Sequence, residues 1–317
     1  MREQIPGAKA AGGDAGQSAA APVRFSVVVL TFARDLSIEP TLASLEAAIG
    51  ARRDVEVILV DNNPDAVDRA PLIARFARPV VVKTGENRGV SARNDGMAAA
   101  AGEFIVLLDD DVLIQSLDLF ERLEADFAAH PDVGLVNVRK LDAATLRQRK
   151  DCIPHTNKKI DPTKPFLTFK FIGGLVGLRR AVFEATGGYN PTIFFGAEEK
   201  EYSYRIIGAG WKIYYDPAIV ALEQNAPGGR PDIAKANTDL VMNTYKIAFL
   251  HKPWPAAMAD ASVFTLFMGA TRFGKVSIPG ALAGFRAWLR RPDRPRRRPL
   301  DAQALAYIRA CGGATWR

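Results

Sequence analysis

The segment Glu103–Ile114, with the sequence EFIVLLDDDVLI, is the starting point for the fold of this chain. Its apolar run, Phe104–Leu108, has the length and composition of a strand that is buried on both faces, as in a parallel sheet covered by helices. Because side chains alternate along a strand, we expect Asp109 and Asp111 to point the same way, about 7 Å apart. Two such charges repel by roughly 2 kcal/mol at an effective dielectric of 20, so the pair favours a bound cation.

Three further strand-like segments precede this one: FSVVVLTF (25–32), VEVILVDNN (55–63) and PVVVKTGEN (79–87). Helical patterns separate the strands, and alternation of this kind predicts right-handed crossovers and a doubly wound α/β sheet. Ligands of such sheets bind beyond the carboxyl ends of the strands. Asp61 and the three aspartates 109–111 lie at those ends.

The second half of the chain is less regular. Residues 143–165 are rich in lysine and have no clear period, so we expect a loop over the sheet. Glu198–Ile207 has the pattern of a helix that ends at a glycine-rich turn, and WKIYYDP (211–217) reads as a strand. After about Glu223 the strand signals stop, and the rest is helical, interrupted by proline, and finally rich in arginine.

Composition sets the outer bounds. A chain of 317 residues with 48% hydrophobic content can bury one large core with a smaller appendage. Cys152 and Cys311 match no metal-ligand or redox spacing, which favours a reducing cytoplasm. The first 22 residues have no apolar signal-peptide core and are expected to be disordered. The apolar stretch 256–273 contains two charged residues, and we expect no membrane-spanning helix there.

Three interpretations of Asp109–Asp111 remain open on these residues alone. The first is a solvated acidic turn. The second is a phosphatase of the haloacid dehalogenase type with Asp109 as nucleophile, although that family normally has Thr or Val where Leu113 stands and its acidic strand comes first in the chain. The third is a clamp for a nucleotide diphosphate, with Asp111 on Mg²⁺ or Mn²⁺ and Asp109 toward the ribose, since hard cations prefer carboxylate and phosphate oxygens.

The context favours the third interpretation. In order along the chain stand SVVVLTFAR (26–34), VEVILVDNNPD (55–65) and NRGVSARNDGMAAAAGEFIVLLDDD (87–111). With them the chain resembles the family 2 glycosyltransferases of GT-A fold, whose motifs read S-V-V-I-P-T-Y-N-R, a second strand ending in Asp, N-x-G-x-x-x-A-R-N-x-G and Asp-x-Asp. The resemblance runs from Phe25 to about Glu223. It implies a mixed, Rossmann-like GT-A sheet over residues 23–224, followed by a helical, basic region over 225–317.

For the donor, the resemblance implies a uridine or thymidine diphosphate sugar. Asp61 would accept the imide N–H of the base, and Asn87, Arg88 or Arg93 would contact base, ribose or phosphate. Pairing with surface carboxylates is the alternative role for the two arginines. The implied donor-binding set is Thr31, Arg34, Asp61, Asn87, Arg93, Asp109 and Asp110, with Asp111 as metal ligand.

For the acceptor, GGYNPTIFFGAEEKEYSYRIIGAGWKIYYDP (187–217) is similar to the family segment G-G-F-D-E…F-F-x-x-E-D-x-D-L-x-x-R. On this match Glu198 and Glu199 are the catalytic positions, with Glu199 as the general base. The alternative is that they, with Glu201, only complement a helix dipole. The chain departs from the family at two positions: Glu199 replaces an Asp, and Glu223 stands where many members carry a metal-binding His, so Glu223 is a further candidate ligand.

The basic C-terminal region suggests a partner of its own. In FRAWLRRPDRPRRRPL (285–300), Phe285, Trp288 and Leu289 stand among clustered arginines. This combination suits an anionic membrane surface, at around 1 kcal/mol per charge near the headgroups. A solvated tail or a nucleic-acid contact has the same composition.

The sequence therefore predicts metal-dependent transfer of a sugar, with inversion, to a hydroxyl of a polysaccharide, glycolipid or lipid-linked saccharide. We expect a cytoplasmic enzyme, peripheral at the inner face of the membrane, without a nucleic-acid partner. The alternatives are a non-catalytic sugar-nucleotide-binding protein and the Asp-x-Asp phosphatase. A nucleotidyltransferase is disfavoured because LTFARD (30–35) lacks the glycine-rich loop that such enzymes use on triphosphates.

Overall fold

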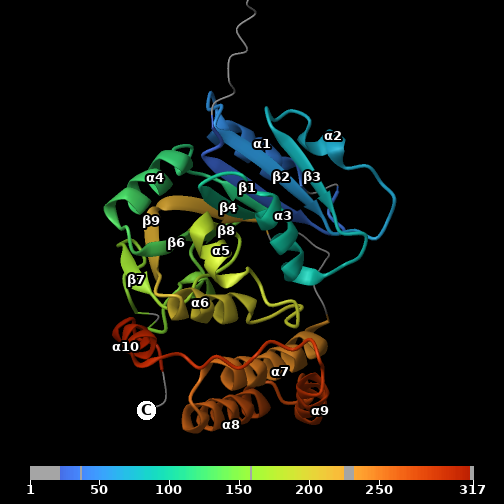
Figure 1. The fold of residues 1–317 in the computed structure, drawn as a ribbon, viewed down its shortest axis with the longest axis vertical. Coiled ribbons are helices and arrows are strands. Elements are labelled where there is room, and N and C mark those ends of the chain that lie inside the picture. The colour runs from blue at the N-terminus through green and yellow to red at the C-terminus, as the bar shows by residue number, and fades with distance from the viewer. Residues whose placement is uncertain (1–21, 36–37, 158, 225–231, 315–317) are drawn as a thin grey trace, which may run out of the picture.

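The computed structural model describes residues 22–35, 38–157, 159–224 and 232–314, which form an α/β domain above a layer of helices (Figure 1). The predicted disordered tail lies outside the described residues except for residue 22. One sheet has the strand order β3-β2-β1-β4-β8-β6-β9-β5, and β7 pairs with β9. The strands are β1 (Phe25–Thr31), β2 (Val55–Asp61), β3 (Pro79–Lys83), β4 (Phe104–Asp109), β5 (Val112–Ile114), β6 (Val133–Asp142), β7 (Phe166–Thr168), β8 (Leu175–Arg179) and β9 (Lys212–Glu223).

The first four predicted strands are β1 to β4, which pair in parallel, and the fifth, residues 211–217, lies at the start of β9. In register, Thr31 of β1 lies beside Asp61 of β2, and Leu30 lies beside Asp109 of β4. The carboxyl ends therefore meet at one edge, as expected. Hydrophobic clusters cover both faces of these strands, which explains their nearly uninterrupted apolar sequences.

Helices flank the sheet and continue after it. The helices are α1 (Glu39–Ile49), α2 (Ala70–Ile73), α3 (Arg93–Ala99), α4 (Leu119–Ala129), α5 (Arg180–Thr186), α6 (Glu198–Gly208), α7 (Ile233–His251), α8 (Trp254–Thr271), α9 (Ile278–Leu289) and α10 (Ala302–Ala310). Gly96 lets α3 approach the sheet closely, because a Cβ there would lie 2.5 Å from Val28 Cγ1 and 2.6 Å from Val60 Cγ2.

Beyond β4 the sheet becomes mixed. β8 runs antiparallel to β4 and β6, whereas β9 runs parallel to β6. The mixed α/β fold with a helical C-terminal region confirms the predicted fold class. Strand β6 was not predicted, because its second half, after an irregularity at Val138/Arg139, carries the polar residues Arg139, Lys140 and Asp142.

The expected geometry of the three aspartates was wrong in one respect. Strand β4 ends at Asp109, and the chain turns before β5 begins at Val112. Strand alternation therefore does not extend to Asp111, and Asp109 and Asp111 pair with different arginines.

Helix α7 contacts the loop of the α/β domain that precedes α6. Asn243 Nδ2 donates to the carbonyls of Phe195 (3.0 Å) and Gly196 (2.9 Å), and Lys246 Nζ donates to the carbonyl of Thr192 (2.7 Å). On its other side α7 packs against α8 and α9. Helix α7 therefore supports the loop that precedes α6.

The predicted membrane anchors of the C-terminal region are packed inside it. Trp288 is 3% exposed, and its ring stacks on Phe285 at a centroid distance of 5.7 Å. The guanidinium groups of Arg294 and Arg297 lie over the ring of Phe249. This corrects the role proposed for Phe285 and Trp288. Within the described part of the chain, no helix combines the length and apolarity needed to cross a bilayer.

Candidate active site

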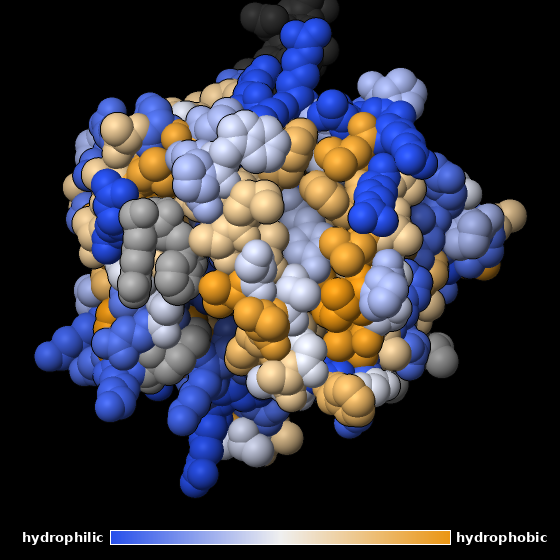
Figure 2. All heavy atoms as spheres, turned by 90° about the horizontal axis from the view of Figure 1, so that it is seen from below, coloured by the Kyte–Doolittle hydropathy of each residue, from blue (hydrophilic) through white to orange (hydrophobic). Residues whose placement is uncertain are grey.

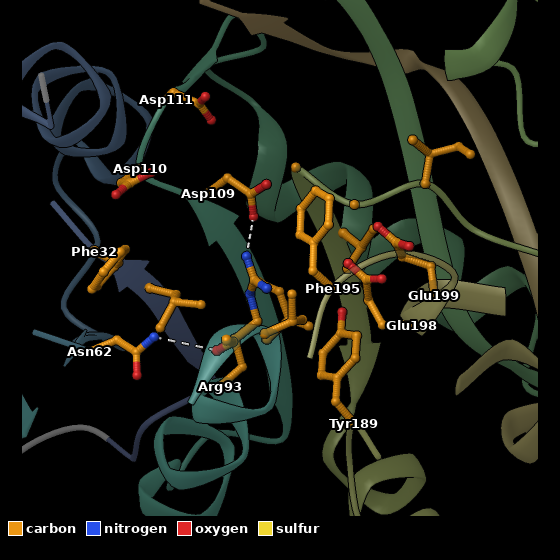
Figure 3. A pocket seen from close by; sticks show the side chains of 18 of the residues that line it. Phe32, Asn62, Arg93, Asp109, Asp110, Asp111, Tyr189, Phe195, Glu198 and Glu199 are labelled. Carbon is orange, nitrogen blue, oxygen red and sulfur yellow. Dashed lines mark hydrogen bonds and ion pairs between the residues drawn. The ribbon is translucent and has the colours of Figure 1, made fainter. Parts of the chain in front are cut away.

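A cavity of about 430 Å³ opens at the carboxyl edge of β1, β2 and β4 (Figure 3). Its volume is within the range typical of small-molecule sites. Nine of the eleven predicted site residues line it: Arg34, Asn87, Arg93, Asp109, Asp110, Asp111, Glu198, Glu199 and Glu223. Figure 3 shows the aspartates on one side and the two glutamates of α6 on the other, with Arg93 and Phe195 between them.

The acid cluster, Asp109–Asp111, is neutralised by two arginines. Arg93 forms an ion pair with Asp109. Arg34 Nη1 lies 2.7 Å from Asp110 Oδ1 and 2.8 Å from Asp111 Oδ2. Burial raises the pKa of Asp110 to about 6, against the opposing effect of Arg34. The cations beside Asp109 and Asp111 are therefore two different guanidinium groups, and that of Arg34 is shared by Asp110 and Asp111.

Two predicted donor-binding residues do not line the cavity. Asp61 is 1% exposed, and its Oδ1 accepts from the backbone N–H (3.1 Å) and Nδ2 (2.9 Å) of Asn63. Its Oδ2 accepts from Arg69 at 3.2 Å. Thr31 is fully buried. In this arrangement Asn62, the residue after Asp61, reaches the cavity instead.

Asn87 and Arg88 have local roles in the loop before α3. Asn87 Oδ1 accepts from Asn62 Nδ2 and from the N–H of Gly89, both at 3.0 Å, so Asn87 both lines the cavity and holds its wall. Arg88 is paired with Asp95 and does not line the cavity.

Helix α6 begins at the cavity and presents two glutamates to it. The preceding residue, Ala197, has a left-handed backbone with φ of 67°, a strained conformation that turns the chain into the helix. Glu198 is 7% exposed, and its Oε2 has no hydrogen-bond partner among the described residues. Burial, and then the charge of Glu199, raises the pKa of Glu198 to about 8.

Glu199 is held in a space that a glycine provides. Burial raises the pKa of Glu199, and the charge of Asp109 raises it further. A Cβ on Gly173 would lie 2.8 Å from Glu199 Oε1. The additional methylene of Glu199, relative to the Asp of the family motif, is therefore accommodated by the missing side chain at position 173. Glu201 faces away from the cavity and pairs with Arg205 at 2.8 Å and His251 at 3.0 Å.

The two residues proposed for a metal lie close together, Asp111 in the turn before β5 and Glu223 at the end of β9, which pairs with β5. Gln224 N donates to the carbonyl of Asp111 at 2.9 Å, which brings Glu223 next to the acid cluster. Glu223 Oε2 is 3.2 Å from Lys140 Nζ. Across the described ranges, no group of three or more His, Cys, Asp or Glu could hold a metal alone. Two carboxylates suit Mg²⁺ or Mn²⁺ that arrives with a diphosphate, because such ions take one or two protein carboxylates and complete their shell with phosphate and water.

The sequence analysis missed several cavity residues. Phe32 stands where the family motif has Tyr, so the motif already marked it. Tyr189, whose ring lies 5.9 Å from the Arg93 guanidinium, follows the quoted GG pair. Lys140 had no signal, because it lies on the unpredicted strand β6.

Comparison with known proteins gives the family and the fold. The chain matches the family described as "Glycosyl transferase family 2" over residues 26–187. It is 29% identical over 169 residues to an uncharacterised protein of Haemophilus influenzae, covering 51% of this chain and 90% of that protein.

Solved structures share the fold at low sequence identity. GalNAc-T7 with UDP, GalNAc and Mn²⁺ has a TM-score of 0.59 and 17% identity, covering 75% of this chain; this chain spans about half (50%) of that one. Residues 1–349 of S. aureus TarS in complex with UDP-GlcNAc give 0.55 and 16%, covering 71% of this chain and 66% of that one. The mannosyltransferase PcManGT from Pyrobaculum calidifontis, with GDP-Man and Mn²⁺, gives 0.54 and 20%, covering 92% and 84%.

The mixed sheet and its flanking helices share the GT-A fold of these glycosyltransferase structures. The family match extends over half of the chain. This chain belongs to glycosyl transferase family 2.

Proposed function

We propose that the enzyme transfers a sugar from a UDP- or dTDP-sugar to an acceptor hydroxyl, with inversion at the anomeric carbon. The observation that carries the proposal is that the acid cluster and Glu199 line the same cavity from opposite sides (Figure 3). A donor diphosphate at the acid cluster would place its sugar toward Glu199. The acceptor is a saccharide of a polysaccharide, glycolipid or lipid-linked carrier, and the enzyme works at the cytoplasmic side of a membrane.

In this proposal Glu199 removes the proton of the acceptor hydroxyl while its oxygen bonds to the anomeric carbon. The bond from that carbon to the diphosphate breaks, and the nucleoside diphosphate leaves. Burial raises the pKa of Glu199, which makes its carboxylate a stronger base than a solvent-exposed one. Glu198, with its unpartnered Oε2, forms a hydrogen bond with a substrate hydroxyl.

On the donor side Arg34 and Arg93 bind the diphosphate and ribose, together with Asn87, Asp109 and Asp110, while Phe32 and Asn62 contact the base. Asp111 and Glu223 would hold Mg²⁺ or Mn²⁺, which would supply positive charge against the departing diphosphate. Thr31 and Asp61 support this wall from beneath, and Asp61 contacts the base only if the donor displaces its present partners.

The decisive experiment measures nucleoside diphosphate release from a panel of UDP-, dTDP- and GDP-sugars, with Mn²⁺ and with EDTA. We expect Mn²⁺-dependent release by the wild type and none by Asp111→Ala or Glu199→Gln. The melting temperature of Asp111→Ala should stay near that of the wild type, because Arg34 keeps Asp110 as a partner. Asp151→Ala, an exposed aspartate outside the cavity, is the matched control.

Undiminished release by Asp111→Ala would contradict the assignment of the donor site. Tight donor binding by the wild type without release or transfer would instead establish a non-catalytic sugar-nucleotide-binding protein. Trapping of an aspartyl phosphate at Asp109 would identify the phosphatase alternative.

A further inference from the structure

Helix α8 presents an uncharged, largely apolar face to solvent. Among the described residues, eight of the fourteen exposed large hydrophobic side chains lie after residue 231. On α8 the exposed apolar residues include Met258 (65%), Val263 (47%), Leu266 (73%) and Phe267 (56%), and Phe273 beyond its end is 91% exposed. We call these five side chains the α8 face. Figure 2 shows apolar side chains gathered on this side of the molecule, with hydrophilic ones at the margins.

The only charged residue within α8 does not reach this face. Asp260 has a side chain that is 15% exposed, and it pairs with Lys252 at 3.0 Å. Val263 lies three residues before Leu266 and four before Phe267, spacings that place these three side chains on one side of the helix. The opposite side packs on α7, where Thr265 Oγ1 lies 2.6 Å from the Tyr245 hydroxyl. The α8 face is therefore exposed to solvent and is not part of the contact between α8 and α7.

Positive charge is concentrated in the same part of the chain. Residues 254–300 contain nine Lys and Arg but two Asp, a net charge of +7 that equals the formal net charge of the entire chain. Arg272 and Lys275 adjoin the C-terminal end of α8, and Arg286 on α9 and Arg290 just after it are exposed. A second copy of this chain would bring the same positive charge to the contact. An apolar face bordered by cations instead complements a surface that is apolar inside and anionic outside.

We propose that the α8 face docks on a bilayer that contains anionic lipids, with Arg272 and Lys275 at the headgroups. This deepens the proposed function, because it rests on the membrane association proposed there and names the surface responsible. The surface differs from the one that the sequence suggested, since Trp288 is buried. Docking through α8 also places the cavity near the membrane, because α7 contacts α8 on one side and the loop that precedes α6, which lines the cavity, on the other. Two helix-packing intervals of 8–10 Å put the distance from the axis of α8 to this loop at about 20 Å.

The test is co-sedimentation of the full chain with vesicles, without donor or acceptor. We expect binding to vesicles of phosphatidylcholine with 30% phosphatidylglycerol, weakened by added salt, and at least tenfold weaker binding to phosphatidylcholine alone. Leu266→Ser/Phe267→Ser should lower the affinity for anionic vesicles at least tenfold, and Arg272→Gln/Lys275→Gln should reduce both the affinity and its salt dependence. Because no sugar nucleotide is used, this test and the release assay can fail separately.

The matched control is Leu117→Ser/Leu146→Ser, which removes two equally exposed leucines (60% and 64%) from the α/β domain and should bind as the wild type does. Circular dichroism melting of each variant monitors folding. The proposal is overturned by equal binding to the two kinds of vesicle, by wild-type binding of the Leu266/Phe267 variant, or by absence of binding. It is also overturned if light scattering shows a dimer that this variant abolishes, since the face would then contact a second copy.

Discussion

Replacing Gly173 by alanine should displace the carboxylate of Glu199, the proposed base, while leaving the residue at position 199 unchanged. The new Cβ would lie 2.8 Å from Glu199 Oε1, whereas ordinary contacts of a Cβ begin at 3.4 Å, so the oxygen must retreat by about 0.6 Å. A misplacement of about 1 Å costs on the order of 100-fold in rate, and 0.6 Å accordingly about 10-fold, or about 1.4 kcal/mol in the barrier.

The assay is steady-state release of nucleoside diphosphate with acceptor present, alongside thermal unfolding. We expect kcat of Gly173→Ala to fall about 10-fold while KM for the donor and the melting temperature change little, since the displaced atom is the end of a flexible side chain. The double variant Gly173→Ala/Glu199→Asp removes the contact, so the two substitutions should be non-additive. Unchanged kcat in Gly173→Ala, combined with an inactive Glu199→Gln, would refute the placement of the carboxylate.

Three further predictions concern the charges and the packing around the site. Arg34→Met leaves the acid cluster without its shared cation and should lower the free energy of unfolding by about 3 kcal/mol in EDTA. Mn²⁺ should raise the melting temperature of the variant more than that of the wild type. An equal rise would show that Arg34 does not occupy the place of a metal. Burial, and then the charge of Asp216, raises the pKa of Asp126 to about 7. Between about pH 4 and about pH 7 the folded protein holds a proton on Asp126 that the unfolded chain has lost, so this group makes the free energy of unfolding fall as pH rises through that range. In urea titrations Asp126→Asn should be more stable than the wild type at pH 8, by about 1 to 2 kcal/mol after solvent screening, with no such gain at pH 4. Gly96→Ala should lose about 1 to 3 kcal/mol in the same titrations, because its Cβ would lie 2.5 Å from a methyl carbon of β1, whereas Gly269→Ala, with open space around it, should lose nothing.

Much of the fold was readable from local pattern. The apolar runs of β1, β2 and β4 require burial on both faces, and the polar residues that follow them identify the edge where a ligand binds. The second half of β6 was not predicted because its pairing with β9, rather than its composition, makes the residues after Val138 a strand. The same holds for β5, which is three residues long.

Some residues of the site were likewise predicted from the sequence, and others were not. The motifs marked the acid cluster, Arg93 and Glu199, and all of them line the cavity. They did not reveal that the carboxylate of Asp61 is paired with Asn63 and Arg69, or that Lys140 reaches the cavity from strand β6. Such partners depend on side-chain rotamers and on contacts between elements far apart in the chain, and a linear motif contains no information about either.

By itself, the sequence determined the first four strand-like segments that alternate with helices, the acidic strand end, the glutamates that begin a helix, and the resemblance to a transferase family, since each of these is encoded by neighbours along the chain. Only the tertiary structure decided which charges neutralise one another and which apolar side chains stay in water. Trp288 is buried and Leu266 exposed, although both lie in apolar helical stretches, because burial depends on which face α7 covers, and that follows from how the helices pack.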